Sequence, residues 1–277
     1  MRALAAANRA LAELKGRAAT IPNQGILIDT LALQEAKASS EIENIVTTQD
    51  ELFQLGLFPD GLESGAAKEV ARYRDALKLG LTQLLDTGGL IRNATLVEMY
   101  QFLKVRSDGF RSAPGTALMN DRTGEVIYVP PQDRNEIITA MSSLEAFIND
   151  DEICQLDPLI KMALIHHQFE SIHPFADGNG RIGRILNVLY LTKTGLLDIP
   201  ILYLSRHINQ HKAEYYRLLQ SVREEGDWEA WVLYMLEAVE KTSRTTLALV
   251  EGIRKQMADM KQRLRTQLPK LYSQDLL

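Results

Sequence analysis

IHPFADGNGRIGR, residues 172 to 184, lies between two stretches with helical periodicity. Residues 159–169 precede it, and apolar residues at helical spacing follow it, namely Ile185, Val188, Leu189 and Leu191. The Pro, Asp and Gly residues in its middle indicate a loop. The segment therefore predicts a helix, a loop, and a second helix that begins at the Gly-Asn-Gly turn.

This turn, Gly178, Asn179 and Gly180, is suited to binding phosphate. Backbone N–H groups in the first turn of a helix have no partners within the helix, and the helix dipole is positive there. Arg181 and Arg184 follow at a spacing that places both on one face of the helix. Because two guanidinium groups one turn apart can bind neighbouring phosphates, the segment predicts a polyphosphate site.

Two further side chains of the segment can supply chemistry. Asp177 offers a hard oxygen ligand at the edge of the turn, and Mg²⁺ typically takes one or two protein carboxylates. His173 is the candidate general base, because imidazole can accept a proton near neutral pH. A Gly-Asn-Gly turn alone is most often a structural cap, but here the base, the carboxylate and the arginines occur together.

Residues 173–184 resemble the signature of the Fic family, His-Pro-Phe-x-Asp/Glu-Gly-Asn-Gly-Arg-x-x-Arg, at every specified position. The resemblance implies an all-α Fic fold, a helical bundle with one β-hairpin flap. It also implies that His173 deprotonates a target hydroxyl and that Asp177 binds Mg²⁺. ATP is then held by the turn and the helix after it, through Gly178, Asn179, Gly180, Arg181, Ile182, Gly183 and Arg184. Doc-type phosphotransferases have Lys at the position of Gly180, so the glycine favours AMP transfer.

A second motif lies upstream, in Ser39-Ser40-Glu41-Ile42-Glu43-Asn44. It resembles the inhibitory helix motif of self-inhibited Fic proteins, Ser/Thr-x-x-x-Glu-Gly/Asn, which implies an inhibitory role for Ser39, Glu43 and Asn44. The alternative interpretation is a helix-capping pattern, in which Ser and Glu also recur at close spacing. If the motif is inhibitory, the Glu43 carboxylate pairs with Arg184 and occupies the group that should bind the γ-phosphate.

Residues 116–129 depart from the helical pattern. Two short apolar runs flank Asn120-Asp121-Arg122-Thr123-Gly124, and Pro130-Pro131 follow, which predicts a β-hairpin. The family resemblance implies that this hairpin is a flap which binds an extended target segment by strand addition. Val126, Ile127 and Tyr128 are the residues expected to do so.

The resemblance also implies that Tyr215 and Tyr216 lie near the adenine, with Arg223 a weaker candidate, although core packing of the two tyrosines is an alternative. His166 and His167 lack the spacing that places two zinc ligands on one helix face. We interpret Cys154, the single cysteine, as a partly buried free thiol.

Most of the remaining chain has helical periodicity, and its turn signals divide it into about nine or ten helices of ordinary length. We expect an N-terminal leader with the inhibitory helix at 1–60, a Fic catalytic core at 61–245 and a C-terminal helix at 246–277. The ending LPKLYSQDLL resembles the approach to a winged-helix segment.

The composition limits the partners of the chain. Its net charge of −5 argues against direct binding of nucleic acid by a broad basic face. The N-terminus has no unbroken apolar run, so we expect no membrane anchor, and the cysteine usage favours the cytoplasm.

We therefore predict a protein adenylyltransferase that uses Mg²⁺ to transfer AMP from ATP to a Tyr, Ser or Thr hydroxyl of a target protein bound at the flap. Glu43 inhibits it by competing for Arg184. Removal of AMP from a modified protein is the enzymatic alternative, and a regulatory or DNA-linked module with vestigial activity is the alternative of another class. A homodimer is left open.

Overall fold

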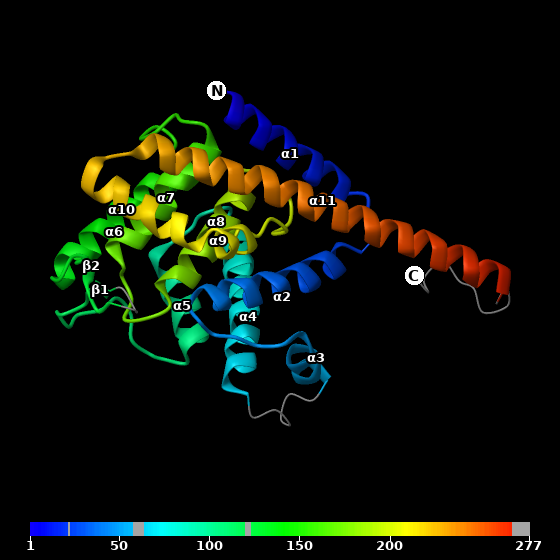
Figure 1. Ribbon diagram of the computed structural model, residues 1–277, viewed down its shortest axis with the longest axis horizontal. Coiled ribbons are helices and arrows are strands. Elements are labelled where there is room, and N and C mark those ends of the chain that lie inside the picture. The colour runs from blue at the N-terminus through cyan, green and yellow to red at the C-terminus, as the bar shows by residue number, and fades with distance from the viewer. Residues whose placement is uncertain (22, 58–63, 120–122, 268–277) are drawn as a thin grey trace.

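The computed structural model describes residues 1–21, 23–57, 64–119 and 123–267. The structure is a helical bundle with one two-stranded antiparallel sheet, as predicted (Figure 1). In chain order the elements are α1 Arg2–Ala18, α2 Gln24–Ile42, α3 Gln49–Leu57, α4 Gly65–Asp86, α5 Asn93–Lys104, β1 Leu118–Met119, β2 Val126–Tyr128, α6 Arg134–Asn149, α7 Pro158–Ile172, α8 Asn179–Lys193, α9 Ser205–Gln210, α10 Lys212–Glu225 and α11 Trp228–Gln267.

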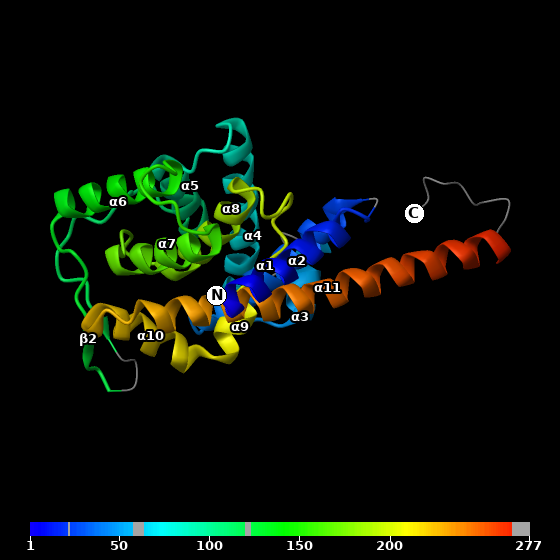
Figure 2. The same cartoon turned by 90° about the horizontal axis from the view of Figure 1, so that it is seen from above.

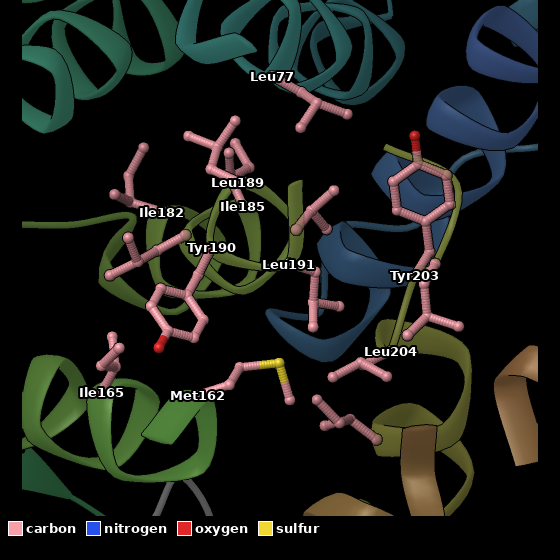
Figure 3. Close-up of a cluster of buried hydrophobic side chains, with 14 of the residues drawn as sticks. Leu77, Met162, Ile165, Ile182, Ile185, Leu189, Tyr190, Leu191, Tyr203 and Leu204 are labelled. Atoms are coloured by element: carbon pink, nitrogen blue, oxygen red, sulfur yellow. The ribbon is translucent and has the colours of Figure 1, made fainter. Parts of the chain in front are cut away.

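Helix α8 lies at the centre of the bundle. It packs against α2, α4, α5 and α7, and its residues from 181 to 191 are buried, polar and apolar alike. Its side chains Ile182, Ile185 and Leu189 meet Leu77 of α4 and Ile165 of α7 in the cluster shown in Figure 3. The polar residues at the start of α8 are therefore held by a helix that the core surrounds.

The loop between α7 and α8 is fixed at both ends. Asp157 caps α7 by accepting from the N–H of Leu159, and Pro158 opens the helix. Helix α7 ends at His173, whose φ of 49° is in the left-handed region. Helix α8 begins after Gly178, with φ 77°, a conformation that glycine adopts without steric cost.

The predicted hairpin is present at the opposite end of the molecule from the free end of α11 (Figures 1 and 2). Leu118 pairs with Tyr128 and Met119 with Val126, and the register shifts between the two pairs. Residues 120–122 of the predicted turn lie outside the described residues. The side-chain amide of Gln220 in α10 donates to the carbonyl of Ile127, which attaches the hairpin to the bundle.

The last helix is longer than predicted. Within the described residues there are eleven helices rather than nine or ten, and α11 alone has 40 residues. It runs without a break through position 246, the predicted start of the C-terminal segment, and packs against α1 in both views (Figures 1 and 2). The division into 1–60, 61–245 and 246–277 stays a prediction, and residues 268–277 lie outside the described part. No helix of the described ranges has the length and apolarity needed to cross a bilayer.

Candidate active site

The Gly-Asn-Gly turn forms the start of α8, as predicted, and its asparagine holds the loop in shape. The side chain of Asn179 accepts from the N–H of Phe175 and donates to the carbonyl of the same residue, both at 2.8 Å. Because Asn179 is buried, its amide is used up in closing the loop. What the turn offers a ligand is its backbone, at residues 179–181, whose N–H groups have no acceptor within the helix.

Ile182 and Gly183 face the core rather than the turn. The N–H of Ile182 already donates to the carbonyl of Gly178 at 3.0 Å, and its side chain is fully buried. A Cβ on Gly183 would lie 2.6 Å from Oε1 of Glu170 in α7. The structure thus gives both residues a packing role, and their contact with a nucleotide stays a prediction.

His173 lies at the rim of the turn, half-buried, with Nδ1 hydrogen-bonded to no described residue. Burial lowers the pKa of His173 to about 4, and the cations of Arg111 and Arg223 act in the same direction. The imidazole is therefore neutral at pH 7. Arg111, which sequence analysis missed, fixes the loop by donating from Nε to the carbonyl of His173 and from its N–H to that of Pro174, both at 2.8 Å.

Asp177 and Arg181 belong to one network with two residues that sequence analysis missed. Nζ of Lys104 lies 2.6 Å from Oδ2 of Asp177 and 2.8 Å from Oε1 of Glu69. Glu69 also accepts from Nη1 of Arg181, whose Nη2 lies 3.6 Å from Oδ1 of Asp177. Glu69 is 112 positions from Arg181 in the chain, so no local signal points to it.

The predicted contact between Glu43 and Arg184 is present. Nη2 of Arg184 donates to Oε1 of Glu43 at 2.8 Å and to the carbonyl of Ser39 at 2.9 Å, while Nε donates to Oγ of Ser39 at 2.7 Å. Burial alone would lower the pKa of Arg184, but the charge of Glu43 raises it above the ordinary value. Ser39 lies inside α2 and Glu43 is its C-cap, so the alternative of an N-terminal capping motif is wrong.

The last residue of the upstream motif ends this helix. Asn44 has a φ of 61°, which asparagine tolerates better than most residues. Its Oδ1 accepts from Nζ of Lys212 in α10 at 3.3 Å. Asn44 therefore ends α2 immediately after Glu43 and connects it to α10.

A cleft of about 1110 Å³ separates the end of α2 from the hairpin and α10, and Glu43, Ile127, Tyr216 and Arg223 are among its lining residues. Tyr216 is 44% exposed. Tyr215, by contrast, is buried and its hydroxyl lies 2.9 Å from Nε2 of His166. Core packing is thus the right interpretation of Tyr215, and Tyr216 alone faces the cleft.

The hairpin is attached to the bundle through Tyr128, while its neighbours on β2 are exposed. The hydroxyl of Tyr128 donates to the carbonyl of Ser171 at 3.0 Å, and the guanidinium of Arg223 lies 3.9 Å from the centre of the Tyr128 ring. Val126 and Ile127 are exposed. Of the three predicted flap residues, Ile127 lines the cleft, Val126 is exposed beside it on β2, and Tyr128 attaches the strand to the bundle.

The two histidines before the loop, His166 and His167, contact other parts of the core. His166 is fully buried between Tyr215 and α8, and Nε2 of His167 lies 3.2 Å from the carbonyl of Leu219. Among the described residues no three His, Cys, Asp or Glu side chains are grouped as a metal ion would require. Cys154 is a half-buried free thiol.

Comparison with known proteins agrees with the sequence signature. A model described as "Fic/DOC family N-terminal" matches residues 1–82, and one described as "Fic/DOC family" matches residues 80–191. A curated relative, "Protein adenylyltransferase Fic" of Drosophila erecta, is 31% identical over 115 residues, which cover 42% of this chain and 22% of that protein. The chain thus matches less than a quarter of the relative's length.

Solved structures have the same fold. A Fic family protein from Desulfovibrio desulfuricans superposes with a TM-score of 0.70 at 22% identity, covering 90% of this chain and 75% of that one. A Fic domain containing signaling protein from Bacteroides thetaiotaomicron gives 0.72 at 20% identity, covering 89% and 98%. With the two family models covering residues 1–191 between them, the chain belongs to the Fic/DOC family.

Proposed function

We propose that this protein is a Mg²⁺-dependent adenylyltransferase that transfers AMP from ATP to a Tyr, Ser or Thr hydroxyl of a target protein, and that Glu43 restrains it. The observation that carries the proposal is the position of Arg184. This buried cation lies one turn into the helix whose start can bind phosphate, and a carboxylate of another helix occupies it. The name of the curated relative supports the same activity.

The chemistry begins at His173. Its neutral imidazole can accept the proton of the target hydroxyl while the hydroxyl oxygen attacks the α-phosphorus of ATP. The bond from that phosphorus to the bridging oxygen breaks, and pyrophosphate leaves. Backbone N–H groups of residues 179–181 would stabilise the charge on the α-phosphate, because they are held in place before the reaction. Arg181 and Arg184 would bind the rest of the phosphate chain.

The residues present fit a magnesium ion. Burial acts to raise the pKa of Asp177, but the hydrogen bond from Lys104 lowers it overall, so the carboxylate is ionised at neutral pH. Its side chain is 60% exposed, at the edge of the turn. One such carboxylate is the usual protein contribution when phosphates and water complete the shell. Bound there, the ion would neutralise charge on the phosphate chain.

The cleft offers places for the adenine and for the target. Tyr216 presents an exposed ring on which a base could stack. Strand β2 lies at the edge of a two-stranded sheet, where an extended peptide could add as a further strand beside Val126 and Ile127 once Gln220 releases the carbonyl of Ile127. This mode uses main-chain hydrogen bonds, so it would present a hydroxyl with little demand on the surrounding sequence.

The proposed inhibition is competition between Glu43 and the γ-phosphate for the guanidinium group of Arg184. While Arg184 is bound to Ser39 and Glu43, it cannot bind the γ-phosphate, and ATP would enter in a pose that misaligns its α-phosphate. The enzyme would then turn over slowly until Glu43 is withdrawn.

The test is incubation of the parent, Glu43→Gly and His173→Ala with α-labelled ATP and Mg²⁺, followed by measurement of label on protein. We expect Glu43→Gly to label itself or an added target at least tenfold faster than the parent, and His173→Ala to lose labelling. Glu41→Gln is the matched control, because Glu41 pairs with Lys37 and Asn209 instead. It should label as the parent does.

Equal labelling by the parent and Glu43→Gly would overturn the inhibitory role. The same variants separate the alternative of AMP removal, in which Glu43 orients a water. In that case Glu43→Gly would release less AMP from a modified protein than the parent.

A further inference from the structure

Beside the Gly-Asn-Gly turn, four side chains of alternating charge form a closed ring of ion pairs. Arg181 contacts Glu69, Glu69 contacts Lys104, Lys104 contacts Asp177, and Asp177 lies near Arg181 again. The ring has no net charge. It joins the proposed metal ligand and the first arginine to two residues from α4 and α5, outside the sequence signature.

Lys104 is placed against the turn itself. It is the last residue of α5, and its side chain is 18% exposed. A Cβ on Gly178 would lie 3.5 Å from Cδ of Lys104, so the stem of the lysine runs along the loop that carries the carboxylate. Its ammonium group therefore occupies the immediate surroundings of Oδ2 of Asp177, where a cation bound by that carboxylate would have to lie.

We propose that Lys104 is a built-in substitute for the metal ion, holding Asp177 in place while no divalent cation is bound and yielding the carboxylate when one arrives. This rests on the proposed role of Asp177 as the magnesium ligand. Lys104 is thus a positioning residue that competes with the metal.

Glu69 makes the exchange feasible. A largely buried ammonium left without a partner would be costly. Lys104 keeps its contact with Glu69 at 2.8 Å after it gives up Asp177, and Glu69 keeps Arg181 at the same time. The exchange therefore breaks one ion pair of the ring and leaves the other charges paired.

The test measures metal binding and needs no turnover. Mn²⁺, a probe for the magnesium site, is titrated into protein that carries an ATP analogue which cannot be cleaved between its α- and β-phosphates, since phosphates complete the metal shell. The protein is in slight excess over the analogue, and free Mn²⁺ is followed by electron paramagnetic resonance. Lys104→Met removes the competing ammonium and keeps an unbranched stem. We expect Mn²⁺ to bind about three- to fivefold more tightly than to the parent, since a partly exposed ion pair contributes up to about 1 kcal/mol.

Two variants separate this effect from a change in charge or packing. Lys78→Met removes the same charge from a pair with Asp29 on the outer surface of α4, and should leave Mn²⁺ affinity at the parent level. Lys104→Arg keeps the charge and should not tighten binding. Unchanged or weaker Mn²⁺ binding by Lys104→Met would overturn the proposal.

Asp177→Asn tests the proposed metal ligand separately from the proposed competition by Lys104. It should weaken Mn²⁺ binding at this site more than tenfold, because it removes the carboxylate proposed as the protein's metal ligand. Loss of binding in Asp177→Asn without tightening in Lys104→Met refutes the competition and leaves the metal ligand standing. Full binding by Asp177→Asn refutes both.

Discussion

At the scale of single residues, the two glycines of α8 are required for different reasons. A Cβ on Gly180 would meet Oε1 of Glu43 and would lie 2.9 Å from Nη1 of Arg184, so this glycine leaves room for the ion pair of Glu43 with Arg184. A Cβ on Gly183 would meet Glu170 and Phe169 of α7 instead. The signature therefore combines a glycine beside the ion pair with one that packs the core.

Gly183→Ala should destabilise the protein by about 1–3 kcal/mol, because the added methyl overpacks a buried helix contact. Urea unfolding followed by circular dichroism measures this. Gly252→Ala in α11 is the control, since a Cβ there meets nothing within 4 Å. It should stabilise by about 0.5–1 kcal/mol through helix propensity alone. Equal stability of both variants would contradict the packing role.

Stability should also depend on pH through the buried histidines. Burial lowers the pKa of His166 to about 3 and that of His167 to about 4. The unfolded chain binds these protons below about pH 6.5 and the folded chain does not. The free energy of unfolding therefore falls as the pH drops from 6.5 to 4, by about 1.4 kcal/mol per pH unit for each such proton.

His167→Gln isolates one of these protons, because glutamine can still donate to the carbonyl of Leu219. Its stability should fall less steeply than that of the parent between pH 6 and 4.5. Glu170, whose pKa burial raises to about 7, acts in the opposite direction but equally in both proteins. Parallel curves for parent and variant would show that His167 titrates normally in the folded state.

At the scale of elements, α2 presents two adjacent serines to different surroundings. Oγ of Ser39 accepts from Arg184, whereas Oγ of Ser40 is buried without a hydrogen-bond partner among the described residues. Ser39→Ala should weaken the attachment of α2 by about 1.5–3 kcal/mol, the usual contribution of a hydrogen bond to a charged group. Faster amide hydrogen exchange in α2 would report it.

Ser40→Ala is the matched variant, because it removes a buried hydroxyl that makes no hydrogen bond. It should leave exchange in α2 unchanged or slower. If both variants raised amide hydrogen exchange in α2 equally, the contact of Ser39 with Arg184 would not be what holds α2 in place.

The elements around the site were predictable to different degrees. The helix-loop-helix, the hairpin and the pairing of Glu43 with Arg184 followed from local patterns and the family signature. Lys104 and Glu69, in α5 and α4, and Arg111, in the loop after α5, did not, because each reaches the site from a distant segment and an isolated charged residue resembles a solvated one. The asparagine of the turn was identified correctly, but its role in closing the loop depends on geometry.

At the scale of the whole molecule, the first and last helices of the described chain, α1 and α11, pack against each other. Val250 is the last buried residue of α11, and the residues after 253 are exposed or half-buried. The sequence predicted a helix in this region but not its continuity with the helix before it, because a 40-residue helix exceeds the ordinary range.

A chain that stops after residue 256 should keep its melting temperature within about 2 °C, since surface changes contribute within about 0.5 kcal/mol. Leu14→Ala should lower the stability by about 2–5 kcal/mol, because Leu14 is fully buried in α1. Differential scanning calorimetry compares the two. A large loss on truncation would mean that the projecting part of α11 is covered in solution.

The placement of Glu43 at the very end of α2 has a consequence for the proposed inhibition. Helix termini unwind locally at a small fraction of the free energy that detaching a whole helix demands. Because Ser39 holds Arg184 one turn further in, the last turn can fray while the rest of α2 remains docked. Under the proposed inhibition, the protein should therefore show a steady basal turnover, whose rate equals that of Glu43→Gly multiplied by the fraction of time the terminal turn is unwound.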